Sequence, residues 1–317
     1  MAESRINKLL ILTEDANKYA PLLAAADLPQ LDIVSAGDIG SAAELVTDCN
    51  IILGEPPLVS EVIASARELE WVQSSWAGID SLCQPDLRRD YQLTGVKGIF
   101  GALITEYVIT YLYALERRIF DIRDNQLNKR WRPSRYRLSR DINLGIIGLG
   151  SIGQHLARTA RHLGLQVTGL NRSGQDYGVV EKVYTVDLLA DFLADLDYVV
   201  LTLPATSATR HFVNADFLRM MKSSAVLINV GRGDIINEDE LIHVLQKGEI
   251  GAAVLDVFAT EPLPADSPLW SLPNVYVTPH FAAASFPEDV VKIFSENYHR
   301  FIRQDPLLHL INFELGY

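Results

Sequence analysis

The chain has 317 residues, 48% of them hydrophobic and 21% charged, which is typical of a globular protein of about two domains. A formal net charge of −12 makes nucleic acid and anionic membranes poor partners for most of its surface. No apolar run approaches the roughly 20 residues of a membrane helix, and two cysteines without a CxxC motif predict neither a disulfide framework nor a metal site.

The first third of the chain alternates short apolar runs with helical patterns. The run at 9–12 has no basic lead-in and no small-residue cleavage site after it, so no secretory signal is predicted and we expect a cytoplasmic location. Strand patterns lie at 8–12, 50–53, 71–74 and 92–96, and a helical pattern lies at 58–69. These elements predict a first α/β unit.

A long amphipathic segment at 103–120 predicts one helix that leads to a second unit. From residue 143 onward, strands and helices alternate. Strands are expected at 143–148, 166–170, 197–204, 224–230, 251–257 and 274–278, and helices up to 163 and at 186–194, 215–221, 238–246 and 287–303. Several of these strands are apolar on both faces, which predicts a parallel sheet covered by helices.

A glycine motif follows the strand at 143–148. Gly148, Gly150 and Gly153 form a GxGxxG between a strand and a helix, and this context makes the motif indicative of a dinucleotide site. The amides of Ser151 and Ile152 would then face a pyrophosphate at the positive end of the helix. The alternative is a glycine-rich turn that binds no ligand.

The end of the next strand bears on which dinucleotide is bound. An acid is expected there for the ribose 2′-hydroxyl of NAD, but the sequence has Asn171, Arg172 and Ser173. Arg172 can make charge-assisted hydrogen bonds to a 2′-phosphate, and its two neighbours can add neutral ones. NADPH (NADP) is therefore favoured and NAD stays possible. The alternative is a solvated Arg172, with Asp176 or another group binding NAD.

Two further strand ends carry residues suited to an anionic substrate. Arg232 stands between Gly231 and Gly233 at the edge where open α/β sheets bind ligands, and it can grip a carboxylate and polarise a ketone. An arginine in such a place is also a common surface charge. His280 follows a strand and a proline, and histidine is the usual proton donor near neutral pH. On predicted helices, where surface or packing roles are expected, lie His155, His162 and His243.

Four stretches together resemble the D-isomer-specific 2-hydroxyacid dehydrogenase family, particularly its glyoxylate/hydroxypyruvate reductase branch. They are GLGSIGQHLA at 148–157, LINVGRGDIINEDEL at 227–241, GAAVLDVFATEPLP at 251–264 and NVYVTPHFAA at 274–283. The resemblance implies an α/β fold of two doubly wound, Rossmann-like parallel-sheet domains. A cofactor domain at 103–284 would be inserted into a substrate domain made of 1–102 and 285–317.

The resemblance also assigns roles to residues. Arg232 is implied to hold the substrate, His280 to donate the proton, and Glu261 to orient and charge the histidine. Contacts with the cofactor are implied for Leu203, Pro204, Thr209, Val230, Gly231 and Asp256. For Asp256 the alternative role is that of a cap at the end of its strand.

A loop in the first unit, SSWAGID at 74–80, resembles the family loop that holds the substrate carboxylate. The backbone amides of Ala77 and Gly78 would make this contact, because glycine permits a close approach. Trp76 and Phe100 either wall the same pocket or belong to the core.

The expected function is therefore that of an oxidoreductase that reduces a small 2-oxo acid to the D-2-hydroxy acid, with the substrate in the cleft between the domains. Two alternatives stay open: a dinucleotide-sensing binding protein of the same fold, and an NAD-dependent biosynthetic dehydrogenase for a phosphorylated hydroxy acid. The family is usually dimeric, so a homodimer is expected. The basic, aromatic stretch around Trp131 is expected either at the contact between the subunits or in the pocket of the partner subunit.

Overall fold

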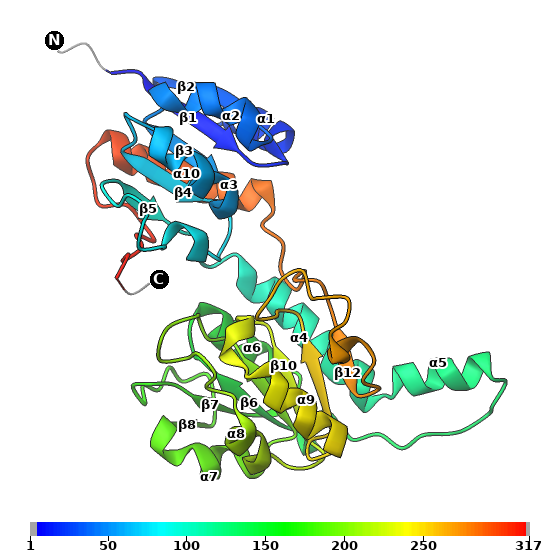
Figure 1. The fold of residues 1–317 in the computed structure, drawn as a ribbon. Coiled ribbons are helices and arrows are strands. Elements are labelled where there is room, and N and C mark those ends of the chain that lie inside the picture. The colour runs from blue at the N-terminus through cyan, green and yellow to red at the C-terminus, as the bar shows by residue number, and fades with distance from the viewer. Residues whose placement is uncertain (1–4, 315–317) are drawn as a thin grey trace. The chain divides into compact units, whose positions relative to one another are not determined.

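The structure, a computed structural model, describes residues 5–314 and divides into two compact units (Figure 1). The first unit combines Met1–Ile99 with Ser285–Tyr317, and the second is Phe100–Ala284. The second unit begins at Phe100 and not at 103, because the helix α4 (Phe100–Glu116) already starts there. The roles of the two units as substrate and cofactor domains stay a prediction.

The first unit is built on one parallel sheet with the strand order β2-β1-β3-β4-β5. The order reverses between β1 and β3, and ligands of open α/β sheets bind outside the carboxyl ends of the strands at such a point. The edge strand β2 was not predicted, because its sequence LDIVSA is only partly buried and forms no continuous apolar run. The strands are β1 (Asn7–Leu12), β2 (Leu31–Ala36), β3 (Ile51–Gly54), β4 (Trp71–Ser74) and β5 (Gln92–Thr94).

The carboxyl-terminal helix is part of the first unit's core. The indole of Trp71 in β4 is fully buried and stacks on Phe294 of α10, with ring centroids 5.0 Å apart. The helix predicted at 58–69 is too long, because α3 ends at Val62 and a 3-10 turn follows. The helices of this unit are α1 (Ala16–Ala25), α2 (Ile39–Leu45), α3 (Pro56–Val62) and α10 (Pro287–Ile302).

The second unit is built on a parallel sheet with the order β12-β11-β10-β9-β6-β7-β8. From β6 to β11 the strands follow the 3-2-1-4-5-6 order of a dinucleotide-binding sheet, and β12 extends it at one edge. The prediction of two doubly wound parallel sheets is confirmed. The strands are β6 (Asn143–Ile147), β7 (Gln166–Leu170), β8 (Lys182–Tyr184), β9 (Tyr198–Leu201), β10 (Val226–Asn229), β11 (Ala252–Leu255) and β12 (Val275–Val277).

The helices of the second unit differ from the prediction at one place. The single helix expected at 103–120 is wrong, because Arg118 adopts a left-handed φ of 53° and separates α4 from α5. No residue of α5 is buried, and Figure 1 shows this helix extending away from the sheet of its unit. The remaining helices are α5 (Ile119–Leu127), α6 (Ser151–His162), α7 (Leu189–Leu193), α8 (Ala215–Met220) and α9 (Glu238–Lys247).

Short 3-10 turns complete the described elements. Within residues 5–314, no helix is long and apolar enough to cross a membrane, and no group of three or more His, Cys, Asp and Glu side chains could hold a metal ion. The turns are η1 (Val46–Asp48), η2 (Ile63–Ser65), η3 (Asp80–Leu82), η4 (Ser139–Asp141), η5 (Val186–Leu188), η6 (Gly233–Ile235) and η7 (Pro268–Trp270).

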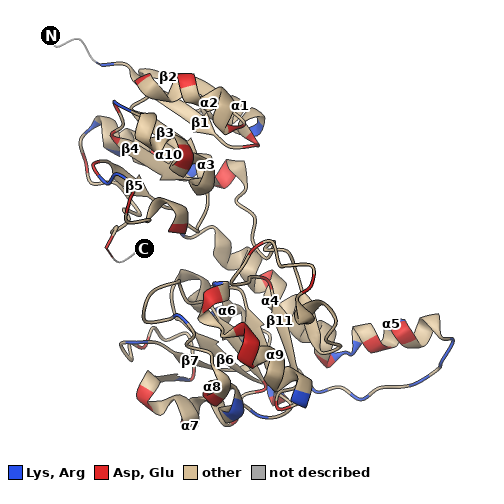
Figure 2. Cartoon of the chain, viewed as in Figure 1, with Lys and Arg blue, Asp and Glu red and all other residues tan. Residues whose placement is uncertain are grey.

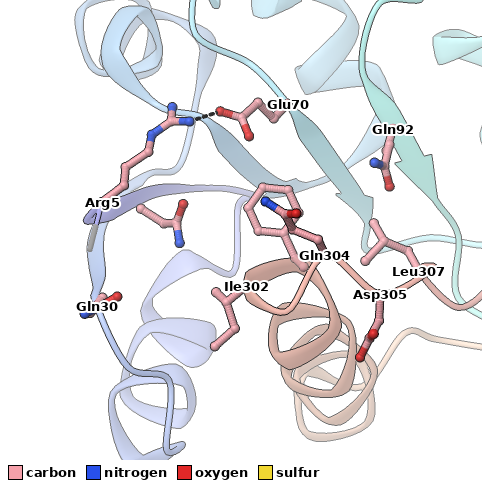
Figure 3. A pocket seen from close by; sticks show the side chains of 10 residues that line it. Arg5, Gln30, Glu70, Gln92, Ile302, Gln304, Asp305 and Leu307 are labelled. Atoms are coloured by element: carbon pink, nitrogen blue, oxygen red, sulfur yellow. Dashed lines mark hydrogen bonds and ion pairs between the residues drawn. The ribbon is translucent and has the colours of Figure 1, made fainter. Parts of the chain in front are cut away.

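A cavity of about 480 Å³ opens at the amino ends of strands in the first sheet (Figure 3). Asn7 begins β1, Glu70 precedes β4 and Gln92 begins β5. The rest of the lining comes from residues just before β1 and β2 and from the end of α10 and the segment that follows it. Arg5 forms a salt bridge with Glu70 across this region. Ligand sites of open α/β sheets lie at the opposite, carboxyl edge, and none of the predicted site residues lines this cavity.

Candidate active site

The glycine motif lies at the turn from β6 into α6, next to the reversal of strand order in the second sheet. A Cβ on Gly153 would lie 2.0 Å from the carbonyl oxygen of Gly148, so only glycine lets α6 pack against this turn. A Cβ on Gly150 would meet no atom within 4 Å, so packing inside the chain does not require this glycine. The amides of Ser151 and Ile152 open α6, which no side chain of the described residues caps. This open, amide-lined turn fits a pyrophosphate.

The end of β7 presents Asn171, Arg172 and Ser173. The side chain of Asn171 donates from Nδ2 to the carbonyl oxygen of Gln175 at 2.8 Å, which folds the segment into a turn. Arg172 and Ser173 are exposed. The carboxylate of Asp176 accepts a hydrogen bond of 2.7 Å from a backbone amide in the same segment. An exposed cation therefore stands at this strand end, whereas the nearby carboxylate is engaged in shaping the loop.

The other predicted cofactor contacts, apart from Asp256, lie after β9 and β10. The hydroxyl of Thr209 donates to the carbonyl oxygen of Pro204 at 2.7 Å and closes the loop after β9. The carbonyl oxygen of Leu203 lies 2.8 Å from the position of a Cβ on Gly231, so this loop touches the one after β10. The structure thus brings Leu203, Pro204, Thr209, Val230 and Gly231 to the same carboxyl edge as the glycine motif.

Arg232 follows β10 in a loop that a buried asparagine holds. Asn229 is fully buried; its Nδ2 donates to the carbonyl oxygen of Arg232 at 2.9 Å, and its Oδ1 accepts from the preceding amide at 3.1 Å. A Cβ on Gly233 would lie 1.8 Å from the carbonyl carbon of Phe258, so glycine is required where the loops after β10 and β11 meet. The half-buried Arg232 is therefore fixed beside the loop that follows β11.

His280 and Glu261 are directly paired, with His280 Nδ1 2.7 Å from Glu261 Oε2. The other carboxylate oxygen accepts from the amide of Phe258 at 2.9 Å. The hydrogen bond with Glu261 raises the pKa of His280, against the opposing effects of burial and of the charge on Arg232. Burial opposes the ionisation of Glu261, but the hydrogen bonds from His280 and Phe258 outweigh it and lower the pKa of Glu261. The arrangement favours the imidazolium form of His280. The pair occupies Nδ1, so the proton on Nε2 is not engaged by Glu261.

The segment that carries His280 is held from behind by a buried carboxylate. His280 has a left-handed φ of 51°, which is uncommon for a residue with a side chain. Asp256 accepts from the hydroxyl of Thr278 at 2.6 Å and from the two amides that follow His280 at 3.0 Å each. Because Thr278 gives its proton to Asp256, Tyr107 of α4 donates to Thr278, at 2.7 Å. Asp256 thus caps its strand end, and its contact with the cofactor stays a prediction.

Replacing Glu261 by glutamine should narrow the pH range of reduction. Glutamine keeps the shape and loses the charge, so the pKa of His280 falls and the ring loses its proton at a lower pH. A general acid acts only when protonated, so activity should fall first on the alkaline side. We expect kcat to drop about tenfold or more at about pH 8 and less at about pH 6.

Initial rates over this pH range check the expectation. The exposed Glu181→Gln is the matched control, because it removes a carboxylate of the same unit that makes no contact with His280 in the described structure. Equal losses for Glu261→Gln at both ends of the range would mean that Glu261 does not set the protonation of the histidine.

The first-unit loop after β4 carries Trp76, Ala77 and Gly78. Ser74 shapes this loop: its hydroxyl accepts from the amide of Trp76 at 3.0 Å and donates to the carbonyl oxygen of Trp76 at 2.7 Å. The side chain of Trp76 is exposed, so it is not a core residue. Phe100 is buried in the first turn of α4 in the second unit. Its burial agrees with the core alternative, and the place of Phe100 and Trp76 in a pocket wall stays a prediction.

Three residues that hold this region were not predicted. Asn229 and Thr278 are polar residues at the ends of apolar strands, in LIN and YVT, and this position is a signal that the sequence offers. Tyr107 lies on an amphipathic helix, where its hydroxyl partner cannot be read from the pattern.

Comparison with known proteins agrees with this geometry. The family model described as D-isomer specific 2-hydroxyacid dehydrogenase, NAD binding domain, matches residues 109–282. Glyoxylate/hydroxypyruvate reductase B of Escherichia fergusonii is 37% identical over 265 residues, which cover 81% of this chain and 82% of the relative. The predicted resemblance to the glyoxylate/hydroxypyruvate reductase branch is confirmed, because several of the matching proteins carry that name.

Solved structures give the same result. A D-isomer specific 2-hydroxyacid dehydrogenase family protein from Aeromonas salmonicida is 44% identical, with coverage of 97% of this chain and 99% of that chain and a TM-score of 0.94. An NADPH-dependent glyoxylate/hydroxypyruvate reductase from Sinorhizobium meliloti, solved with NADP and sulfate, is 28% identical, with coverage of 98% and 100% and a TM-score of 0.88. The chain therefore belongs to the D-isomer-specific 2-hydroxyacid dehydrogenase family, whose members are NAD(P)-dependent enzymes.

Proposed function

We propose that the protein reduces a small 2-oxo acid, of the glyoxylate or hydroxypyruvate type, to the D-2-hydroxy acid and prefers NADPH. The observation that carries this proposal is the 2.7 Å pair of His280 and Glu261. It lies at the same sheet edge as Arg232 and the glycine motif. A proton donor, a cation and a dinucleotide site at one edge are what such a reduction requires. The names of the relatives support the substrate class.

The proposed chemistry follows from the charges. When bound, the reduced nicotinamide supplies the hydride for the 2-carbon of the acid. Arg232 pairs with the substrate carboxylate and polarises the carbonyl, and His280 gives its Nε2 proton to the carbonyl oxygen as negative charge develops there. Glu261 holds Nδ1–H and stabilises the imidazolium until the proton leaves. One hydride and one proton thus convert the ketone into the alcohol, and oxidation reverses these steps.

We assign two further sets of contacts. In the first unit, the backbone amides of Ala77 and Gly78 would bind the substrate carboxylate and Trp76 would wall the site, since Ser74 fixes this loop. For the nicotinamide half of the coenzyme, we assign Leu203, Pro204, Thr209, Val230, Gly231 and Asp256. The glycine motif would hold the pyrophosphate, because its amides open α6.

Arg172 should decide the coenzyme preference. Arg172→Ala should raise the KM for NADPH by about tenfold or more and change that for NADH by less than about twofold, because only NADPH has a 2′-phosphate for the guanidinium. Steady-state kinetics with both coenzymes measure this, and Ser173→Ala should have a smaller effect. If Arg172→Ala leaves the KM for NADPH unchanged and Asp176→Ala raises the KM for NADH, the results would instead support an NAD enzyme.

Initial rates of coenzyme oxidation test the proposal as a whole. The substrates are glyoxylate, hydroxypyruvate, pyruvate and phenylpyruvate, each with NADPH and with NADH. We expect turnover of the first two, faster with NADPH. Tight coenzyme binding without turnover of any acid would contradict the proposal and favour a dinucleotide sensor.

The cysteines support a reducing compartment. Both Cys49 and Cys83 are free thiols, and burial raises the pKa of Cys49 to about 11, which keeps it protonated and unreactive. We therefore propose a cytoplasmic location.

The segment around α5 is the proposed contact of a homodimer. No residue of α5 is buried, and the side chain of Trp131 is 98% exposed. Lys and Arg follow one another along the return from α5 (Figure 2), and Arg137 anchors its end through a salt bridge of 2.8 Å to Asp197. Several large apolar side chains of this segment are exposed, which is typical of an interface, and we assign a second copy of the chain to it. They are Ile119, Phe120, Ile122, Leu127, Trp131, Tyr136 and Leu138.

Trp131→Ala should weaken the dimer by about tenfold or more, since exposed tryptophans are frequent anchors of interfaces. Sedimentation over a range of concentrations measures the dissociation constant. Trp270→Ala is the matched control, because Trp270 is also an exposed tryptophan and lies elsewhere in the second unit. A Trp131→Ala protein with unchanged assembly and kinetics would remove this proposal.

A further inference from the structure

The reversal of strand order in the first sheet carries a half-buried glutamate. Thr13 directly follows β1 and Glu55 directly follows β3, and these two strands are where the order changes. The hydroxyl of Thr13 donates to the carboxylate of Glu55 across this point. Side chains at the carboxyl ends of strands beside such a reversal are those that reach ligands in open α/β sheets.

The backbone holds Glu55 from both sides. Its amide donates to the carbonyl oxygen of Leu12 at 2.9 Å, and the amide of Ser75 donates to the carbonyl oxygen of Gly54 at 2.9 Å. Burial raises the pKa of Glu55, although the hydrogen bonds from Thr13 and from the amide of Glu14 act in the opposite direction. These two donors hold the carboxylate at the edge of the sheet where ligands of open α/β sheets bind.

A second polar group at this edge lacks a partner. Ser75, which follows β4, is 1% exposed, and its hydroxyl forms no hydrogen bond within the described part of the chain. A ligand or a water molecule at this edge would supply the missing partner.

The neighbouring strand leads into the loop that we assign to the substrate carboxylate. β3 and β4 pair in parallel, with Gly54 opposite Ser74, so Glu55 and the start of the loop with Ala77 and Gly78 lie on adjacent strand ends. Adjacent strands are about 4.8 Å apart, so the residues that directly follow β3 and β4 are neighbours at this edge. An acid whose carboxylate is held by the loop amides would then place its third carbon on the side of Glu55.

We propose that Glu55 selects 2-oxo acids that carry a hydrogen-bond donor, such as a hydroxyl, on carbon 3. This inference rests on the proposed function and narrows its substrate class. An ionised carboxylate only accepts hydrogen bonds, so it binds the hydroxyl of hydroxypyruvate and offers nothing to the methyl group of pyruvate. It also repels a second negative charge, so oxaloacetate and phosphorylated hydroxy acids are disfavoured.

The test compares kcat/KM for four acids in the wild type, Glu55→Leu and Glu55→Gln. In the wild type, hydroxypyruvate should exceed pyruvate by about tenfold or more. Glu55→Leu should lower the value for hydroxypyruvate by about tenfold or more and change that for glyoxylate, which has no third carbon, by less than about twofold. Glu55→Gln removes the charge, so it should raise the value for oxaloacetate.

The exposed Glu14→Gln is the matched control, because Glu14 lies near enough for its charge to act on Glu55 but follows Thr13 on the surface. It should leave the ratio of hydroxypyruvate to glyoxylate within about twofold of the wild type. If the Glu55 variants lose kcat/KM equally for hydroxypyruvate and glyoxylate, or for neither acid, the role of Glu55 is overturned while the proposed function stands. A wild type that reduces none of the acids would instead overturn the proposed function and this inference with it.

Discussion

Replacing His280 by alanine will lower kcat for 2-oxo acid reduction by about a thousandfold, because the alkoxide that forms then has no positioned proton donor. The hydrogen bond with Glu261 at 2.7 Å orients the imidazole and favours its charged form. Alanine has no imidazole, so both the proton donor and this hydrogen bond are lost. Coenzyme affinity should change by less than about twofold, since the glycine motif is untouched. Initial rates of NADPH oxidation and the quenching of its fluorescence on binding measure the two quantities.

The exposed His243 on α9 provides the control for this variant. His243→Ala should keep its rate within about twofold of the wild type, because the ring lies on the solvent face of the helix. A loss of less than about tenfold in His280→Ala would mean that another group, or water, supplies the proton.

Arg232→Ala should lower kcat/KM by about a thousandfold, the effect of losing two hydrogen bonds from a cation to a buried carboxylate. Asn229 and Gly233 fix the backbone of this loop independently of the guanidinium, so the fold should persist. Arg232→Lys should recover only part of the activity, because an ammonium keeps the charge and loses the planar fork.

Thermal unfolding and coenzyme binding accompany the kinetics of the Arg232 variants. The control is Arg219→Ala on α8, whose guanidinium pairs at the surface with Glu249 at 3.3 Å. A fully folded Arg232→Ala protein with nearly normal kcat/KM would show that the substrate carboxylate is bound elsewhere.

The second sheet was predictable because its strands leave a direct trace in the sequence. β6, β9, β10 and β11 are almost wholly buried, and burial on both faces produces continuous apolar runs. The glycine motif could be found because it stands immediately after such a run, and His280 because it follows Thr278 and Pro279 at the end of the short strand β12. Strand ends are therefore the places where sequence alone points to a site.

Two of the four strands at sheet edges were not predicted. β2 and β8 lie at the edges of their sheets and are only partly buried, so their sequences mix polar and apolar residues. The break between α4 and α5 was missed because it occurs at Arg118, a residue with no intrinsic preference for the left-handed conformation. Neither feature follows from a local pattern.

The contacts that hold the proposed catalytic groups depend on the tertiary fold. Tyr107 and Thr278 are 171 positions apart along the chain, and their hydrogen bond exists only because α4 packs beside the end of β12. Thr13 and Glu55 are likewise joined only through the pairing of β1 with β3. A sequence shows the residue types for such contacts but not their partners.

The most direct test of the reductase assignment follows the hydride itself. The enzyme is mixed with hydroxypyruvate and NADPH that carries deuterium at both C4 positions of the nicotinamide, and the product acid is examined by NMR and chiral chromatography. We expect D-glycerate with deuterium on carbon 2. Bound coenzyme without labelled acid, or label in L-glycerate, would contradict it.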